Sequence, residues 1–193
     1  MSLETKSARS QRLLLKKELG KRGNILKASW LDTPLDPMLA ISDSNGLYLL
    51  EFVGRKGLQQ AIEKLCKEKA ATIIFGEPEP MKLIRKELAA YFAGTLKKFE
   101  TPVHIRGSVF QRKVWQELLN VPYGETKSYL EQAEAIGNKK AVRAVAGANA
   151  ANRFGIMIPC HRIINTSGEL GGYGGGITRK KWLLEHESKM AIV

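Results

Sequence analysis

The sequence has little cysteine and no long apolar segment. Only two of its 193 residues are cysteines, Cys66 and Cys160, which is too few for the disulfide framework of a small secreted domain. We therefore expect both thiols to be reduced, as in a cytoplasmic protein. No apolar run approaches the ~18 residues that a membrane span needs, and residues 1–6 do not begin a secretory signal. These absences exclude a membrane partner and favour a cytoplasmic location.

Metal ligands are also scarce. The chain has three scattered histidines and no pair of cysteines at Cys-x-x-Cys spacing, so the usual pattern of a zinc site is missing. We expect no metal and no cofactor. The glycine-rich residues 171–176 are typical of a flexible or phosphate-binding loop, but they lack the Lys-Ser/Thr ending of a P-loop.

Basic residues are in excess, and they are unevenly distributed. The formal net charge is +12; residues 1–27 contribute +6, residues 28–104 are neutral and residues 105–193 contribute +6. A neutral middle between two basic ends indicates that the ends meet a polyanion such as nucleic acid. A basic protein that its charge merely keeps in solution has the same composition, so this alternative stays open.

The order of the expected elements predicts an α+β fold. Strands are expected at 25–30, 38–41, 47–53 and 72–75, with a hairpin turn at 43–46. Helical apolar spacing predicts helices over 56–69, where Cys66 lies in the apolar stripe, and near 80–93. Residues 8–20 have the pattern of a basic amphipathic helix that ends at Gly20.

From Phe110 onward the sequence predicts a mostly helical region. Phe110, Val114 and Leu118, together with Trp115 and Leu119, have the spacing of one amphipathic helix. Residues 122–124 break it. Ser128 is expected to cap a helix over 129–136, and a third helix follows from about 139 to 151. This order is typical of a helix-turn-helix unit, although many small helical domains share it.

The third helix carries almost no bulky side chains. It is rich in alanine, and Arg143 is one of its few long residues. Such a helix can enter a narrow groove of DNA, where an arginine fills a gap in the base stack. Taken without further context, the composition favours the simpler reading, in which the helix packs tightly and Arg143 lies on the surface.

Cys160 and His161 are adjacent within an apolar run that Pro159 precedes. Burial raises the pKa of a cysteine, whereas an imidazole network lowers it and produces the nucleophilic thiolate. For an arbitrary Cys-His pair, the favoured reading is an inert buried thiol beside a histidine bonded to the backbone.

The surrounding residues change this preference. The segment Pro159-Cys160-His161-Arg162 resembles the active-site signature of the O6-alkylguanine-DNA alkyltransferases, the methylated-DNA–protein-cysteine methyltransferases. The resemblance covers residues 105–188 with specific motifs and extends more loosely over 25–104. Outside the signature, the matching residues are Gly124, Glu125, Ser128, Tyr129, Arg143, Ala144, Val145, Gly147, Ala148, Asn152, Ser167, Gly168, Gly171, Tyr173, Gly175, Gly176, Lys180 and residues 182–187.

The resemblance implies a particular α+β architecture. Residues 25–104 are expected to form a ribonuclease-H-like domain of sheet and helices. Residues 105–193 are expected to form a mostly helical, winged-helix-like domain that holds the helix-turn-helix and the active site. Residues 1–24 lie outside the resemblance and are interpreted as a basic arm, or as the remnant of a larger fusion.

The implied activity is repair of O6-alkylguanine, with O4-alkylthymine as a second substrate, by irreversible transfer of the alkyl group to Cys160. His161 would deprotonate Cys160 through a water molecule, and Glu187 would orient His161. Asn152 would brace the turn that holds the pair. Tyr129 would protonate the departing guanine.

The implied partner is double-stranded DNA with an alkylated base, bound by a monomer. The base would be flipped out of the duplex, and Arg143 would take its place in the stack. The other expected DNA-binding residues are Ser128, Tyr129, Ala144, Gly147 and Arg153. The expected base pocket comprises Tyr173, Gly174, Ile163, Gly155 and Ser167, with backbone amides near Ile163 and Gly174 reading the base edge.

The sequence departs from the family at residues 153–155, where proline is common in relatives and Arg-Phe-Gly stands here. We expect this change to widen the entrance of the pocket, and Arg153 to add a phosphate contact. The sequence does not determine which alkyl group is preferred. Two other functions stay open: a DNA-binding regulator or lesion sensor with the same domain, and a cysteine hydrolase, which would have no use for Arg143.

Overall fold

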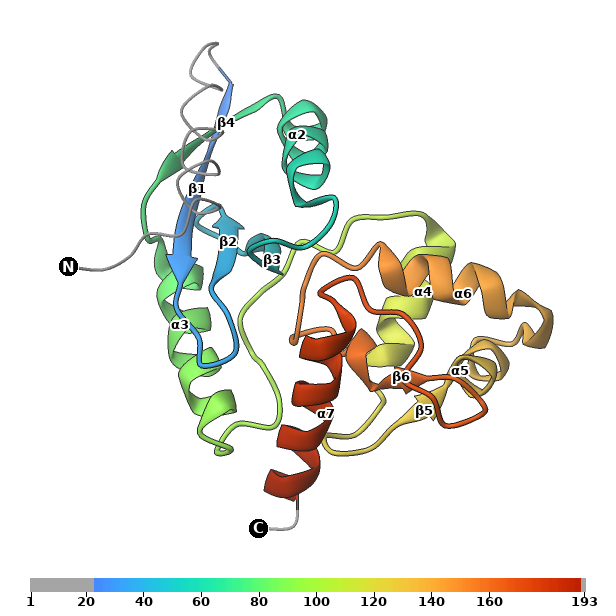
Figure 1. Ribbon diagram of the computed structural model, residues 1–193. Helices are drawn as coiled ribbons and strands as arrows, with labels where there is room; N and C mark the ends of the chain where they lie inside the picture. Colours follow the sequence, from blue (N-terminus) through green and yellow to red (C-terminus); the bar gives the residue numbers. More distant parts are fainter. Residues whose placement is uncertain (1–22, 192–193) are drawn as a thin grey trace.

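A four-stranded sheet forms the first half of the computed structural model, which describes residues 23–191 (Figure 1). Its strands are β1 (Asn24–Leu31), β2 (Met38–Ser42), β3 (Leu47–Phe52) and β4 (Ala71–Phe75), in the order β3-β2-β1-β4. β1, β2 and β3 pair antiparallel, and β4 joins β1 in parallel. Because parallel strands need a crossover, the chain passes through helix α2 (Leu58–Lys69) between β3 and β4.

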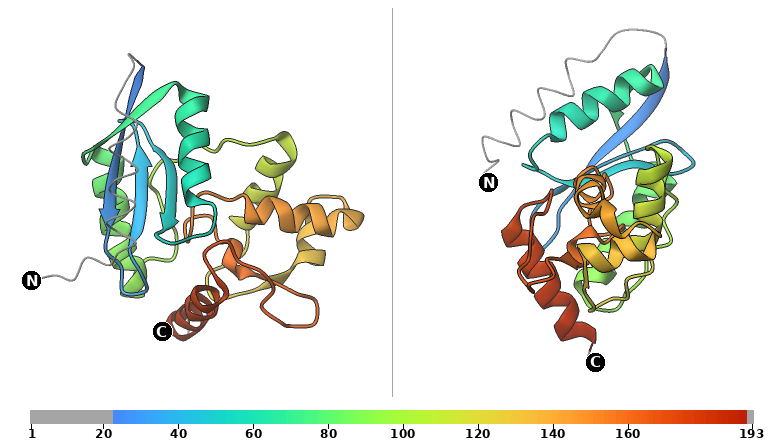
Figure 2. Two further views of the ribbon diagram at one scale, coloured as in Figure 1. Left: turned by 45° about the horizontal axis from the view of Figure 1, so that its top comes forward. Right: turned by 90° about the vertical axis from the view of Figure 1, so that its right-hand side faces the viewer.

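Two helices cover the opposite faces of this sheet (Figure 2). Alternate residues of a strand point to opposite faces, and β2 shows this directly. Leu39 and Ile41 pack with α2, whereas Met38 and Ala40 pack with α3 (Glu79–Phe92). Cys66 is buried between α2 and the sheet, in the apolar stripe where the sequence placed it.

The second half of the chain is mostly helical, and its order confirms the α+β prediction. It comprises α4 (Val109–Leu118), β5 (Lys127–Ser128), α5 (Tyr129–Ala135), η1 (Lys139–Ala141), α6 (Val142–Ala150), η2 (Cys160–Arg162), β6 (Ile163–Ile164) and α7 (Ile177–Ala191). The short strands β5 and β6 pair in parallel.

Local chemistry explains where these helices begin and end. The Ser128 hydroxyl accepts from the backbone N–H of Glu131, and the Glu131 side chain accepts from the Ser128 N–H, so the predicted cap is a complete capping box. The prediction for Leu119 was wrong: α4 ends at Leu118, and Leu119 is 47% exposed. The expected helix over 8–20 lies outside the described residues.

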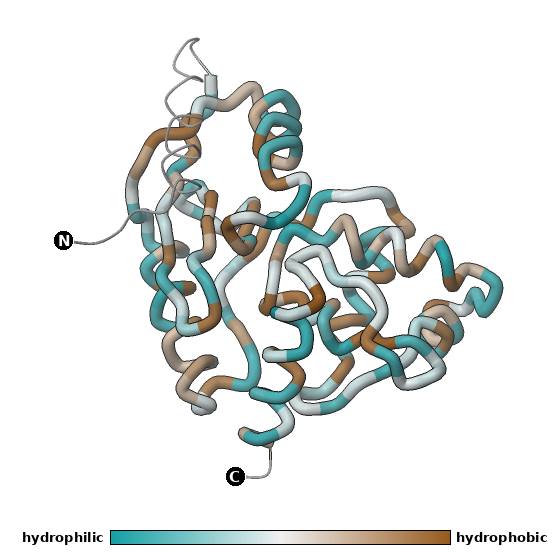
Figure 3. The backbone as a smooth tube through the Cα atoms, viewed as in Figure 1, coloured by the Kyte–Doolittle hydropathy of each residue, from teal (hydrophilic) through white to brown (hydrophobic). Residues whose placement is uncertain are grey.

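The sheet region (residues 24–92) and the helical region (residues 109–191) share one apolar core. The outer edge of β3 is occupied, because Leu47 pairs with Val103 and Leu50 pairs with Phe154. One continuous cluster runs from the α3 side of the sheet into α4, α5 and α6. In Figure 3 the strands carry apolar segments, whereas polar colour dominates α2 and the end of α6 farthest from the sheet. The division into domains at residues 104/105 stays a prediction.

Two further properties concern the described part of the chain. Between residues 23 and 191, no helix is long and apolar enough to cross a membrane. In the same range, no three His, Cys, Asp or Glu side chains lie close enough together to hold a metal ion.

Candidate active site

Asn152 holds the irregular segment that leads from α6 to Cys160. Its side-chain N–H groups donate to the carbonyl of Ile158 at 2.8 Å and to the Cys160 sulfur at 3.2 Å. Its side-chain oxygen accepts from the N–H of Phe154 at 2.9 Å. One buried amide therefore fixes both ends of the segment and points a donor at the sulfur.

Two tight turns aim this segment. Ile156 has a φ of +69°, and the N–H of Met157 donates to the carbonyl of Gly155 at 2.8 Å, which closes a γ-turn. A positive φ on a β-branched residue costs about 1–3 kcal/mol and persists only where its surroundings enforce it. The second turn is centred on Pro159, where the Cys160 N–H donates to the carbonyl of Ile158 at 2.8 Å. Cys160 thus emerges from a constrained backbone.

The Cys160 thiol is buried, with 8% of the residue exposed. Burial raises the pKa of Cys160 to about 11, while the hydrogen bond from Asn152 and the charges of Arg55 and Lys180 oppose the rise. The resting sulfur is therefore a thiol at neutral pH, and a base must remove its proton before it attacks.

His161 can act as that base because Glu187 selects its tautomer. The Nε2 atom of His161 lies 2.9 Å from the Glu187 carboxylate, and both side chains are fully buried. A carboxylate only accepts hydrogen bonds, so Nε2 carries the proton and Nδ1 keeps its lone pair. Among the described residues, the buried Nδ1 has no hydrogen-bond partner. Burial lowers the pKa of His161, which keeps the ring neutral.

Five donors converge on the Glu187 carboxylate. Arg162 donates from Nε at 2.8 Å and from Nη2 at 3.0 Å, the Tyr91 hydroxyl donates at 2.7 Å, and the N–H of Gly124 donates at 3.2 Å. His161 is the fifth. Burial by itself would raise the pKa of Glu187, but His161 and the Arg162 guanidinium hold it well below its usual range. The carboxylate is ionised, as the tautomer argument requires.

A pocket of about 580 Å³ opens onto Cys160. The Tyr129 hydroxyl lies at its wall and donates to the carbonyl of Gly172 at 3.2 Å. Burial raises the pKa values of Tyr129 and Tyr173, so both phenols stay protonated and can donate. The pocket is lined by Arg55, Lys56, Tyr129, Val142, Arg143, Ala146, Asn149, Ala150, Cys160, Asn165, Gly172, Tyr173 and Gly174.

Lys180 ties the glycine-rich loop to the rest of the site. Its ammonium donates to the carbonyls of Ile163, Leu170 and Gly172. Burial lowers the pKa of Lys180 to about 8, although the nearby sulfur favours the charged form. The sequence marked Lys180 as a match to the family, but the three carbonyls it joins become neighbours only in the folded chain.

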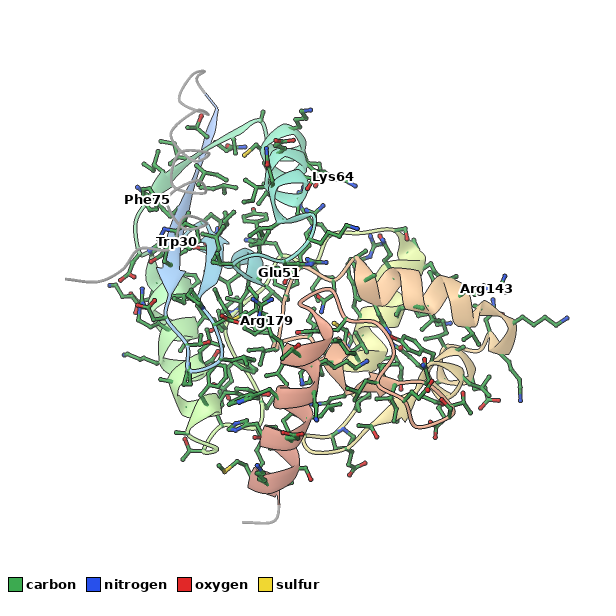
Figure 4. The ribbon with its side chains drawn as sticks, in the orientation of Figure 1. Trp30, Glu51, Lys64, Phe75, Arg143 and Arg179 are labelled. Carbon is green, nitrogen blue, oxygen red and sulfur yellow. The ribbon has the colours of Figure 1, made fainter. Side chains whose placement is uncertain are left out.

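The sheet region contributes an ion pair to the pocket that the sequence did not reveal. Arg55 donates from Nη1 to Glu51 at 2.5 Å and from Nη2 to the carbonyl of Ala150, at the end of α6, at 2.6 Å. Burial raises the pKa of Glu51 to about 7, although the positive charges of Arg55 and Arg179 oppose the rise. Figure 4 shows Glu51 and Arg179 near the middle of the molecule, where β3 meets the start of α7.

Arg179 makes a second connection between the two regions. It donates from Nε to Asp36 at 2.7 Å and from Nη1 to the carbonyl of Gly175 at 2.5 Å. A Cβ on Gly175 would lie 2.5 Å from the ring of Tyr173, so only glycine fits there. The loop that carries Tyr173 is thus held from the sheet side as well as by Lys180.

Two residues expected in the base pocket lie elsewhere. Gly155 is buried and pairs with β3, since its N–H donates to the carbonyl of Leu50 at 2.7 Å. Residues 153–155 therefore join the two regions and do not line the pocket, contrary to the expectation that they shape its entrance. Ser167 is exposed, and its hydroxyl donates to Glu169 at 3.3 Å.

Two other expectations need correction. The N–H of Ile163 donates to the carbonyl of Cys160, so this amide is not available to read a base. Arg153 has a side chain that is only 17% exposed, and its guanidinium lies 3.8 Å from Glu68, so it does not offer a phosphate contact. Arg153 lies beside Glu68 because residues 153–155 follow the edge of β3.

The outer face of α6 has the shape that the sequence predicted. Arg143, Ala144 and Gly147 are exposed, whereas Val145 and Ala148 are buried. Figure 4 shows Arg143 at the outer end of α6. The exposed Ala144 and Gly147 leave this face of the helix slim, while the pocket is bordered by other α6 residues, Arg143 and Ala146 among them.

The raised pKa of Cys160 predicts a slow thiol. With a pKa of about 11, the thiolate fraction is small at neutral pH, so alkylation by iodoacetamide should accelerate roughly tenfold per pH unit between about pH 7 and about pH 9. Peptide mass analysis measures the label on Cys160, with a small-molecule thiol as the control for reagent chemistry. A rate that levels off below about pH 8 would contradict this account.

The family model for the DNA-binding domain of 6-O-methylguanine DNA methyltransferase matches residues 109–189. A methylated-DNA–protein-cysteine methyltransferase from Methanosarcina acetivorans is 39% identical over 157 residues, which cover 81% of this chain and 94% of the relative. One from Mycobacterium bovis is 53% identical over 105 residues; that match covers 54% of this chain and 64% of the relative, less than two thirds of its length.

Solved structures agree with these matches in sequence and fold. The crystal structure of Mycobacterium tuberculosis O6-methylguanine methyltransferase is 38% identical, with a TM-score of 0.72 over 86% of this chain and 94% of that one. Mycobacterium tuberculosis OGT in complex with DNA is 37% identical, with a TM-score of 0.73 and the same coverage. The chain belongs to the methylated-DNA–protein-cysteine methyltransferase family.

Proposed function

We propose that this chain repairs alkylated DNA by moving the alkyl group of O6-alkylguanine onto Cys160, once per molecule. The observation that carries the proposal is that the buried Cys160, which precedes the buried His161–Glu187 pair, lines a pocket of about 580 Å³. O4-alkylthymine, which presents the same alkyl–oxygen bond, is a second substrate.

The site can supply each step of an in-line displacement. His161 takes the thiol proton at Nδ1 through a water molecule, and Glu187 stabilises the imidazolium that forms. The sulfur then bonds to the alkyl carbon while the bond from that carbon to O6 breaks, and the electron pair passes to the guanine. Tyr129 protonates the departing base. The proton on His161 later returns to Tyr129 through water, which restores the starting protonation state of both residues.

The product explains why each molecule acts once. The alkylated Cys160 is a thioether. Removing the alkyl group from the sulfur would require a thiolate to leave from the alkyl carbon. His161 and water have no route to cleave such a bond at neutral pH. Cys160 is therefore consumed, and the protein is a stoichiometric reagent.

The DNA would lie across the slim face of α6. Arg143 would fill the space of the flipped base, and Ala144 and Gly147 would let the backbone of the helix approach the minor groove. Tyr129, at the start of α5, lines the pocket, and Ser128 caps the same helix. Most contacts would be made to phosphates, so binding would depend on salt and little on sequence.

The acting unit is the monomer, because all residues of this site come from one chain. The reaction requires a reduced Cys160 and access to DNA, which favours the cytoplasm.

Intact-mass and peptide-mass analysis tests the proposal directly. The protein is incubated under reducing conditions with a duplex that carries one O6-methylguanine. We expect one added methyl group per molecule, on the peptide with Cys160, together with restored guanine and no second turnover. The peptide with Cys66 is the internal control. If the folded protein binds the duplex but gains no methyl group, the repair function is contradicted and a lesion sensor is favoured. Continued turnover would favour a hydrolase.

Arg143→Ala separates base flipping from chemistry. Because Arg143 would fill the space of the flipped base, its loss should slow repair of a duplex about tenfold or more. Arg143 makes no hydrogen bond to Cys160, His161 or Glu187, so the chemical step itself should be kept. Reaction with free O6-benzylguanine, which needs no flipping, should change less than about twofold. Single-turnover rates with both substrates measure this difference. Equal losses would show that Arg143 serves the pocket instead of the duplex.

A further inference from the structure

Arg55 brings a buried cation from the sheet region into the pocket of Cys160. It follows β3 in the chain and lines the pocket, although it belongs to the half of the protein without the helix-turn-helix. Only 10% of its side chain is exposed. An arginine buried to this degree normally has partners for its donors, because unpaired donors are costly away from water.

Two of the three nitrogen atoms of this guanidinium are occupied. Nη1 donates to Glu51 at 2.5 Å, and Nη2 donates to the carbonyl of Ala150 at 2.6 Å. The third, Nε, is buried and has no hydrogen-bond partner within residues 23–191. The group is thus fixed by contacts to both regions, while the single N–H on Nε has no partner among the described residues.

The available N–H faces the loop that would hold the base. A Cβ placed on Gly174 would lie 3.0 Å from Nε and 3.1 Å from Nη2 of Arg55. Gly174 has no side chain, so this edge of the guanidinium is covered only by backbone. Both residues line the pocket of Cys160. The unpaired donor therefore lies beside the space that a flipped base would enter.

The chemistry of the base identifies the acceptor. Guanine presents O6 and N7 as neighbouring acceptors, and arginine is the residue that most often binds this edge. In O6-alkylguanine the oxygen is an ether that carries the reacting alkyl group, so N7 is the strong acceptor that remains on this edge of the base. We propose that Arg55 contacts the flipped base through a hydrogen bond from Nε to N7, which makes it a specificity-determining residue of the reaction. This inference rests on the proposed repair function.

Such a contact would also assist the transfer. When the bond from the alkyl carbon to O6 breaks, its electron pair enters the purine ring. A cationic donor at N7 stabilises the charge that develops there, and it is already in position. Glu51 holds the guanidinium in place and balances its charge while the pocket is empty.

The test removes the donor and the acceptor separately and together. Arg55→Lys keeps the charge but places a methylene group where Nε stood. The substrate is changed by using 7-deaza-O6-methylguanine in the duplex, in which a C–H replaces N7. Single-turnover rates are measured for wild type and variant on both duplexes, with Arg85→Ala as the matched control. Arg85 is an arginine of α3 that pairs with Glu77 away from the pocket.

We expect each single change to slow transfer about tenfold, because each removes the same charge-assisted hydrogen bond. The two changes together should then cost no more than about twofold beyond either one. Any effect of the 7-deaza group on the leaving base itself is common to both proteins and cancels in the comparison.

Three results would overturn the contact. The first is that wild type reacts equally fast with both duplexes, and the second is that Arg55→Lys reacts as fast as wild type. The third is that the two rate losses multiply when the variant meets the 7-deaza duplex. That third result would mean that Arg55 only shapes the pocket. The wild-type comparison holds even if the variant folds poorly, and thermal unfolding checks the variant. A wild type that is inert on O6-methylguanine would instead refute the repair function itself.

Discussion

The ionised carboxylate of Glu187 is the contact on which the rest of the site depends. It lies in α7, yet its five donors come from α3, from the turn at Gly124 and from the active-site segment. A charge buried this deeply is stable only with such partners, and removing one member of a buried pair typically costs about 3–5 kcal/mol. The same carboxylate that joins these segments also fixes the tautomer of His161. Folding and chemical competence therefore rest on one group.

The sheet region is part of the active site and not only its support. Tyr91 reaches Glu187 from α3, while Arg55, which follows β3 and is held by Glu51, lines the pocket. Asp36 and Arg179 join the sheet to the loop beside Tyr173. The continuous core and the occupied edge of β3 hold the two regions together. The pocket of Cys160 thus has walls from both halves of the chain.

The sequence predicted the features of the fold and of the site that depend on local residue patterns or on the family motif. The pattern of apolar residues and turns predicted the strands, and the Ser128 cap predicted the start of α5. The family resemblance predicted that Glu187 contacts His161. Arg55 and Glu51 were missed because charged residues near a strand end look like solvent-exposed surface; only tertiary pairing buries them. The resemblance also gave no warning that residues 153–155 turn toward β3, since this depends on backbone bonds to Leu50. Contacts between distant segments leave no mark in local spacing.

The most direct test of this account is the protonation state of His161, read by long-range 15N–1H NMR of the imidazole ring. Signals of the three histidines are assigned with His104→Gln and His186→Gln variants. At neutral pH we expect a proton on Nε2 and a bare Nδ1, and the ring should stay neutral below the ordinary histidine pKa of about 6.5, because burial lowers its pKa. A proton on Nδ1, or an imidazolium at neutral pH, would leave no base for Cys160 and would contradict the mechanism.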